Sequence, residues 1–144
     1  MKLGYSTWGM PKVPVDEALE HLAKLGFDGV ELTVIPGYTT ELSKLDAVER
    51  KRIRQLLAKY HLILSAIAAH SNLLADDPEA HAANMARLKG AVDLAVELAQ
   101  GDIMPAINTT PGGSPKEWDD IRDLLLERMR EIVEYAQARG VTIA

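Results

Sequence analysis

Short apolar stretches alternate with longer segments of helical periodicity along the chain, and this alternation constrains the fold more than any other feature. Each apolar stretch typical of a strand is followed by a segment whose apolar residues recur every three or four positions. Because such a unit returns the chain for another parallel strand, the order predicts an α/β fold with a parallel sheet. The predicted strands are residues 2–6, 29–34, 62–69, 103–108 and 141–144, and the predicted helices between them are residues 15–25, 46–60, 78–100 and 115–139.

Helix-start signals support these boundaries. Asp46 and Glu49 have the spacing of a capping box, and Asp77 precedes a proline at the first helical position. Residues 114–117, Ser-Pro-Lys-Glu, form a complete capping box for the last helix, whose apolar face is predicted to begin at Trp118. Pro105 cannot donate to a strand ladder, so we place it at the beginning of the fourth strand.

The composition fits one globular domain over residues 1–144. The chain is 47% hydrophobic and 26% charged, with a net charge of -5, and it holds no cysteine. Disulfides, thiolate metal sites and a cysteine nucleophile are therefore excluded. The acidic balance argues against a nucleic-acid partner, since phosphate binding needs a basic face. The sequence shows no apolar run of membrane-spanning length and no apolar core near Met1, so we expect a cytoplasmic protein without membrane contact.

The connections from strand to helix are longer and chemically richer than the turns from helix to strand. In parallel α/β folds these connections emerge together at the carboxyl ends of the strands, where ligands bind. Hydroxyl, amide and aromatic side chains there suit a small polar ligand such as a sugar. The connections are residues 6–11, 35–40, 70–72 and 108–113.

Two architectures accept this order of elements. A flavodoxin-like, doubly wound sheet has five parallel strands and fits the length of 144 residues. An eight-stranded (β/α) barrel typically needs about 250 residues, so this chain would form about half of one. The first connection, residues 6–13, has one glycine and one proline. It is a poor cradle for a phosphate, which argues against the doubly wound sheet.

Four segments, in order, resemble the sugar phosphate isomerase/epimerase family of xylose isomerase-like TIM barrels. They are residues 1–8 (MKLGYSTW), 22–32 (LAKLGFDGVEL), 65–70 (SAIAAH) and 108–113 (NTTPGG). The resemblance implies the amino-terminal half of such a barrel, with about 4.5 βα units. In the family, a glutamate that binds a divalent metal (Mn²⁺, Mg²⁺ or Zn²⁺) follows the fifth strand. Residues 141–144 stop just before that position. The resemblance thus implies no metal ligands or cofactor in this chain, and no catalysis by it alone.

Two residues are candidates for catalysis. His70 ends the third predicted strand, and the resemblance implies contact with substrate; the alternative is a histidine that merely caps the strand by a hydrogen bond. Glu31 is an acid within an apolar strand, which is costly unless the group is paired or functional. It either points toward the ligand or forms a structural ion pair. His21, His61 and His81 are expected at the surface.

Four further residues are candidates for substrate binding. Trp8 could form a stacking wall for a sugar ring, as could Tyr38, although large aromatic side chains more often serve packing. Asn108 and Thr109 could bind hydroxyl groups, although the turn that follows them explains much of this composition.

A half barrel is expected to have an apolar hollow and two open sheet edges. We therefore expect a homodimer of half barrels. Three functions are compatible with the sequence: part of a sugar isomerase or epimerase, a non-catalytic self-associating scaffold, and a flavodoxin-like binder of small ligands. The apolar strand residues assigned to the hollow are Leu3, Tyr5, Val30, Leu32, Leu64, Ile67, Ile103, Ile107, Val141 and Ile143.

Overall fold

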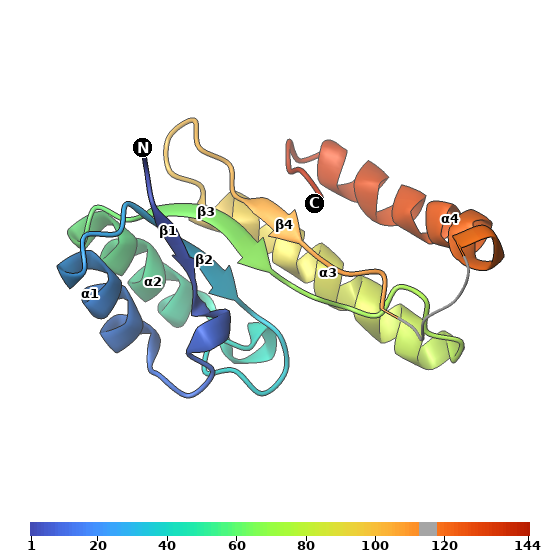
Figure 1. The fold of residues 1–144 in the computed structure, drawn as a ribbon, viewed down its shortest axis with the longest axis horizontal. Helices are drawn as coiled ribbons and strands as arrows, with labels where there is room; N and C mark the ends of the chain where they lie inside the picture. Colours follow the sequence, from blue (N-terminus) through green and yellow to red (C-terminus); the bar gives the residue numbers. More distant parts are fainter. Residues whose placement is uncertain (113–117) are drawn as a thin grey trace.

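The computed structural model describes residues 1–112 and 118–144 and contains a parallel sheet of four strands (Figure 1). The predicted capping box at residues 114–117 lies outside the described residues. No helix of the described part is long and apolar enough to cross a membrane. The strands are β1 (Gly4–Ser6), β2 (Gly29–Thr33), β3 (Ile63–Ala68) and β4 (Ala106–Asn108), and the helices are α1 (Val15–Lys24), α2 (Ala47–Lys59), α3 (Pro78–Leu98) and α4 (Trp118–Gln137).

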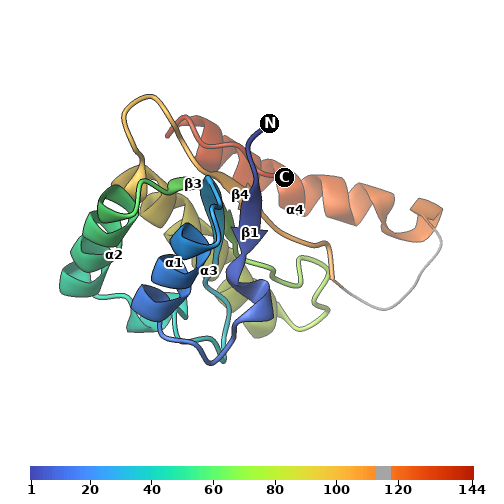
Figure 2. The same ribbon diagram turned by 60° about the vertical axis from the view of Figure 1, so that its left-hand side comes forward.

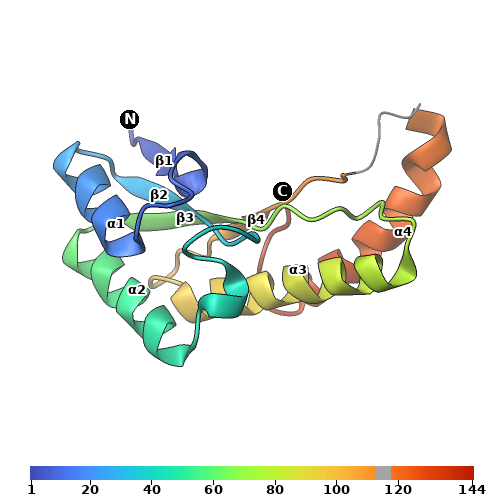
Figure 3. The same cartoon turned by 90° about the horizontal axis from the view of Figure 1, so that it is seen from below.

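The strand order distinguishes the two architectures. The strands lie in the order β1-β2-β3-β4, and all neighbouring pairs are parallel. Because each right-handed crossover advances in the same direction, every helix falls on the same face of the sheet (Figures 2 and 3). A flavodoxin-like sheet reverses its strand order and carries helices on both faces. That alternative is wrong, and the sheet is the beginning of a barrel.

The fifth predicted strand lies beside β4. Ile143 forms a parallel bridge with Ile107, whose backbone N–H donates to the Thr142 carbonyl at 2.8 Å. The fourth strand is shorter than predicted, because it begins at Ala106. Pro105 cannot donate a ladder hydrogen bond, so the ladder starts directly after it.

The predicted apolar hollow is wrong. Val30, Leu64 and Ile67 are at most 1% exposed and belong to one core with helix residues such as Leu19 and Leu88. Side chains alternate between the faces of a strand, so the apolar set packs toward the helices. Leu32, Ile107 and Val141 are buried in the same core.

The open face of the sheet instead carries small and polar side chains. Ser6 and Glu31 are register partners on this face, and Ser65 is exposed on β3. Three residues assigned to the hollow are exposed elsewhere: Leu3 and Tyr5 at the β1 edge and Ile103 before β4. A polar concave face is suited to a polar ligand rather than to a dry core.

The last helix differs from prediction at its start. Trp118 is 57% exposed, so its predicted inward orientation is wrong. The apolar face of α4 becomes buried only later, at Ile132 and Ala136. A side chain in the first turn of a helix is buried only if a neighbouring helix or strand extends alongside that turn.

The start of α3 offers a direct test of capping. The Asp77 carboxylate accepts a hydrogen bond from the Ala80 backbone N–H at 2.9 Å, and Pro78 occupies the first turn, as predicted. We expect Asp77→Ala to lower the free energy of unfolding by about 1 kcal/mol, because a helix N–H loses its acceptor. Urea unfolding measures the loss. Asp76→Ala is the matched control, since the neighbouring Asp76 is exposed and is not the cap. An equal loss in both variants would contradict the capping role.

Candidate functional site

A hydrogen-bonded carboxylate lies at the centre of the open face. The Ser6 hydroxyl donates to Glu31 Oε1 at 2.5 Å, and the Asn108 amide donates to Glu31 Oε2. The three side chains come from β1, β2 and β4. Glu31 reaches across β3 because its register partner there, Ala66, is small. These two hydrogen bonds offset the free-energy cost of partly burying the carboxylate, so no ion pair is needed to hold Glu31 in place.

Three aromatic rings form a second part of the site, which we call the aromatic wall: Trp8, Tyr38 and His70. The Trp8 ring centroid lies 5.9 Å from that of Tyr38 and 4.9 Å from that of His70, the latter edge-on at 74°. The Tyr38 hydroxyl donates to the Trp8 carbonyl at 3.0 Å. The wall joins the connections that follow β1, β2 and β3. Trp8 is 49% exposed, so part of its ring is accessible to a ligand.

His70 has an unused polar atom. Its Nδ1 is buried and has no hydrogen-bond partner among the described residues. A buried polar atom without a partner carries a free-energy cost, so such atoms are often found where a ligand or water completes the bond. The simple strand-capping role that we considered for His70 would require a hydrogen bond that this nitrogen does not make.

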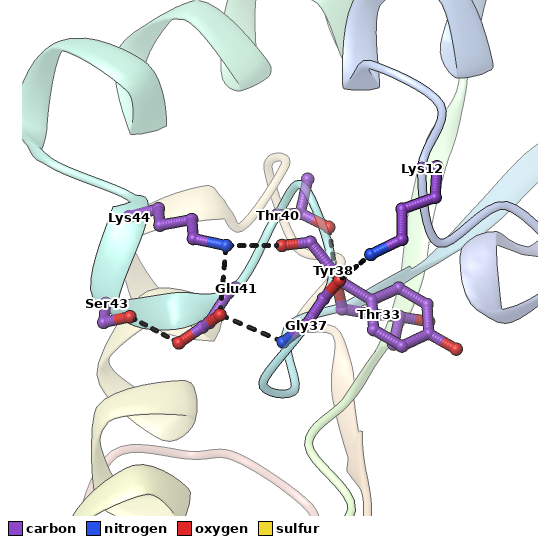
Figure 4. A network of polar contacts seen from close by, with 8 residues as sticks. All are labelled: Lys12, Thr33, Gly37, Tyr38, Thr40, Glu41, Ser43 and Lys44. Carbon is purple, nitrogen blue, oxygen red and sulfur yellow. Dashed lines mark hydrogen bonds and ion pairs between the residues drawn. The ribbon is translucent and has the colours of Figure 1, made fainter.

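A polar network holds the β2–α2 connection that carries Tyr38 (Figure 4). Glu41 accepts from the Gly37 backbone N–H at 3.0 Å and pairs with Lys44 at 3.1 Å. Lys44 also donates to the Tyr38 carbonyl at 3.2 Å, and Lys12 donates to the Gly37 carbonyl at 3.2 Å. The backbone on both sides of the Tyr38 peptide is therefore fixed, and with it the position of the ring beside Trp8.

The network predicts an unusual titration of Glu41. The Gly37 N–H, then the Ser43 hydroxyl and Lys44, lower the pKa of Glu41 from 4.5 to about 2. Because the folded pKa lies below the unfolded one, the stabilisation by this carboxylate is complete above pH 4.5 and is lost as the pH falls through about 2. We expect the side-chain carbon resonance of Glu41 to titrate with a midpoint near 2. The Gly37 amide resonance should follow it, and Glu41→Gln should remove that response. A midpoint near 4.5 would show that the network does not persist in solution.

Thr109 lies apart from the other candidate residues. Its backbone N–H donates to the Ala144 carbonyl at 3.0 Å, and its hydroxyl is buried without a partner among the described residues. The residue lines a cavity of about 220 Å³ with Leu73 and Met129. Alternation along the chain explains the difference, because Asn108 points to the open face and the next side chain points away from it.

The sequence did not single out Ser6 as a member of the site. Its only signal was its position at the end of the first apolar stretch, and only the parallel register places it opposite Glu31. Of the three histidines expected at the surface, His21 and His61 are exposed, whereas His81 on α3 is half-buried.

The described residues do not fit a complete metal site. Residues 1–112 and 118–144 contain no cluster of three or more His, Asp or Glu side chains that could hold an ion. Glu31 already accepts from Ser6 and Asn108, and His70 stands beside Trp8. Glu31 and His70 therefore do not by themselves make a metal site in the described part of the chain.

A sequence comparison agrees with this architecture, in which parallel strands have helices on one face and a polar open face on the other. The model of the xylose isomerase-like TIM barrel family matches residues 19–144. The chain belongs to this family. None of the curated proteins matches the chain. Solved structures of similar fold include members of the xylose isomerase-like group, and they show the fold without defining the substrate of this chain.

Three of these structures illustrate the likeness. A D-psicose 3-epimerase from Clostridium cellulolyticum H10, with D-tagatose, has a TM-score of 0.76 and 20% identity, over 99% of this chain and 51% of the epimerase. The IOLI protein with a bound zinc atom has a TM-score of 0.79 and 19% identity, and the match covers 100% of this chain and 50% of the IOLI protein. A xylose isomerase-like TIM barrel protein from Mycobacterium smegmatis with magnesium has a TM-score of 0.71 and 22% identity, and the match covers 99% of this chain and 53% of that protein. The chain spans about half the length of the solved structures it matches.

Proposed function

We propose that this chain forms the substrate-binding wall of a sugar isomerase or epimerase of the xylose isomerase-like type, and that it is not catalytic alone. The observation that carries the proposal is the convergence of side chains on the open face. Glu31 lies there with two hydrogen-bond donors, and the aromatic wall closes the carboxyl ends of the first three strands.

The chemistry of these groups suits a polyhydroxylated ligand. An exposed indole such as Trp8 offers a flat apolar face for the C–H side of a sugar ring. Glu31 and Asn108 offer carboxylate and amide oxygens that can accept from hydroxyl groups, and His70 Nδ1 needs a partner. Substrate turnover and divalent-metal binding in this family are properties of complete barrels, and we do not propose either for this chain alone.

Catalysis needs more than these residues supply. Isomerisation of a sugar moves a proton between carbons, which requires an acid and a base on the reacting atoms and stabilisation of the developing oxyanion. Glu31 is the only carboxylate in the network we describe on the open face, and no metal cluster accompanies it in the described part of the chain. We therefore expect the remaining half of a barrel to supply the rest of the machinery.

The test combines binding and turnover. In a Trp118→Phe background, Trp8 is the remaining tryptophan, and its fluorescence should change saturably with millimolar ketohexose. We expect Trp8→Phe to weaken the binding, monitored by ligand-observed NMR. Incubation with Mn²⁺ or Mg²⁺ and ketoses should give no product above the blank. If no saturable binding were seen at any accessible concentration, the proposed sugar-binding role of the aromatic wall would be wrong. Metal-dependent turnover would contradict the proposal that the chain is not catalytic alone.

We also propose that two copies of the chain associate. Among the described residues, β1 pairs only with β2, and its outer edge leaves backbone groups open. Leu3 and Tyr5 at this edge are 51% and 40% exposed. Since the chain spans about half of the barrels it resembles, a second copy supplies a matching edge, with β1 of each copy beside residues 142–144 of the other.

Light scattering after size exclusion tests this association. We expect a dimer at micromolar concentration and a monomer for Tyr5→Glu, because a charge at the β1 edge opposes pairing. Val48→Glu is the control, since Val48 is 76% exposed on α2, away from the sheet edge. A clean monomer of the parent chain, or a dimer that survives Tyr5→Glu unchanged, would count against the arrangement.

A further inference from the structure

A cavity of about 250 Å³ opens between the β2–α2 connection and α3. It is separate from the site on the open face, because neither Glu31 nor any ring of the aromatic wall lines it. Its volume corresponds to about eight water molecules in the liquid, which is enough room for a small molecule. The lining residues are Val34, Pro36, Glu41, Leu42, Ser43 and Arg87.

Arg87 brings to this cavity a positive charge that has no carboxylate partner among the described residues. Its guanidinium donates to Ser71 Oγ at 3.2 Å and to Asn84 Oδ1 at 3.1 Å, and both acceptors are neutral. No carboxylate of the described residues forms an ion pair with it within 4.0 Å. A guanidinium has five N–H donors, so three have no acceptor among the described residues and are available to a ligand. A bound anion would stabilise a half-buried positive charge of this kind by pairing with it.

The one acid of the cavity does not neutralise Arg87. Glu41 accepts from the Gly37 N–H at 3.0 Å and the Ser43 hydroxyl at 2.8 Å, and it pairs with Lys44 at 3.1 Å (Figure 4). Its carboxylate is thus committed to the connection that it stabilises. The cavity thus combines the guanidinium of Arg87, whose hydrogen-bond acceptors are both neutral, with the apolar side chains of Val34, Pro36 and Leu42.

We propose that this cavity binds a small organic anion. Its oxyanion group pairs with the guanidinium of Arg87, and its short carbon skeleton contacts Val34, Pro36 and Leu42. Charge-assisted pairing with a planar fork is strong and directional, which selects a carboxylate or a phosphate head group. The apolar walls distinguish an organic anion from an inorganic one.

The position of the cavity connects it to the aromatic wall. Arg87 donates to Ser71, which directly follows His70, and Glu41 and Leu42 belong to the connection that carries Tyr38. An anion in the cavity would therefore contact the connection that carries Tyr38, and also Arg87, which is hydrogen-bonded to Ser71. We expect its binding to change the fluorescence of Trp8. The anion site does not depend on the proposed sugar binding being correct, because none of its lining residues belongs to the aromatic wall.

Succinate is the probe, followed by amide NMR spectroscopy of the full chain. We expect saturable shifts at Ser43 and Arg87 with millimolar succinate, and none with the neutral succinamide. Inorganic phosphate should bind at least tenfold more weakly than succinate. If phosphate binds equally well, the apolar walls contribute nothing and the organic anion is the wrong ligand. Shifts that are absent, or that map only to other lysines and arginines, also overturn the site.

Two variants and a control complete the test. Arg87→Gln should weaken succinate binding at least tenfold, and Arg54→Gln, which removes an exposed charge on α2, should leave it unchanged. Ser43→Glu keeps Arg87 and its hydrogen bonds but places a carboxylate on the cavity wall, so it should also abolish binding. A folded Ser43→Glu variant that binds succinate as tightly as the parent would contradict the assignment.

Discussion

Replacing Ile67 by alanine should destabilise the protein by about 3 kcal/mol, because the side chain lies in the core with no exposed surface. Ile67 lies on β3, an interior strand that pairs with β2 and β4, and packs with helix residues such as Leu88. The alanine leaves a cavity that the surrounding helices cannot fill. Chemical denaturation, followed by far-ultraviolet circular dichroism, measures the loss.

Ile63→Ala is the matched control on the same strand. Ile63 is only half-buried and borders a shallow pocket near Gly4 and Gly29. The same change of side chain should therefore cost about 1 kcal/mol or less. The difference between the two isoleucines tests which face of the sheet carries the core. If both variants lost the same free energy of unfolding, the open face would be as well packed as the helix-covered face, which would contradict the structure.

Gly112→Ala should be the second strongly destabilising change. Gly112 has φ +70°, where a non-glycine residue is strained by about 1–2 kcal/mol. An added Cβ would also lie 2.6 Å from the Asn72 backbone, closer than any real contact. Overpacking typically adds about 1–3 kcal/mol. We expect a total loss of about 3 kcal/mol in denaturant unfolding. In the Trp118→Phe background, we also expect a shifted Trp8 fluorescence, because the connection after β3 moves.

Gly26→Ala separates the two causes. Gly26 has φ +82° but no atom within 4 Å of an added Cβ, so this variant reports backbone strain alone. It should lose about 1 kcal/mol, as expected for a left-handed residue in open space. If Gly112→Ala loses no more than Gly26→Ala, the close approach of the connections after β3 and β4 is not maintained in solution.

Local signals in the sequence predicted the elements well. The aspartates at residues 46 and 77 cap α2 and α3, and the strands β2 and β3 occur within one or two residues of their predicted bounds. Capping and periodicity are properties of a few consecutive residues, so the sequence contains them in full. Pro105 likewise limited β4, although the strand begins after it rather than at Ile103.

The candidate site could be predicted in part. Trp8, Tyr38 and His70 were selected because each follows a strand, and the structure brings their rings together. Whether they bind substrate stays a prediction. Ser6 and Arg87 were not selected, because their significance depends on register and on a cavity between distant segments.

The sequence by itself determined the alternation of parallel strands and helices, the caps and the end of the sheet at which polar side chains gather. Only the tertiary structure decided which face of each strand meets the helices. Alternation defines two faces but does not say which one is covered, and that depends on the hand of the crossovers. The same packing placed Val30 and Ile67 in the core and left Glu31 on the open face, between Ser6 and Asn108.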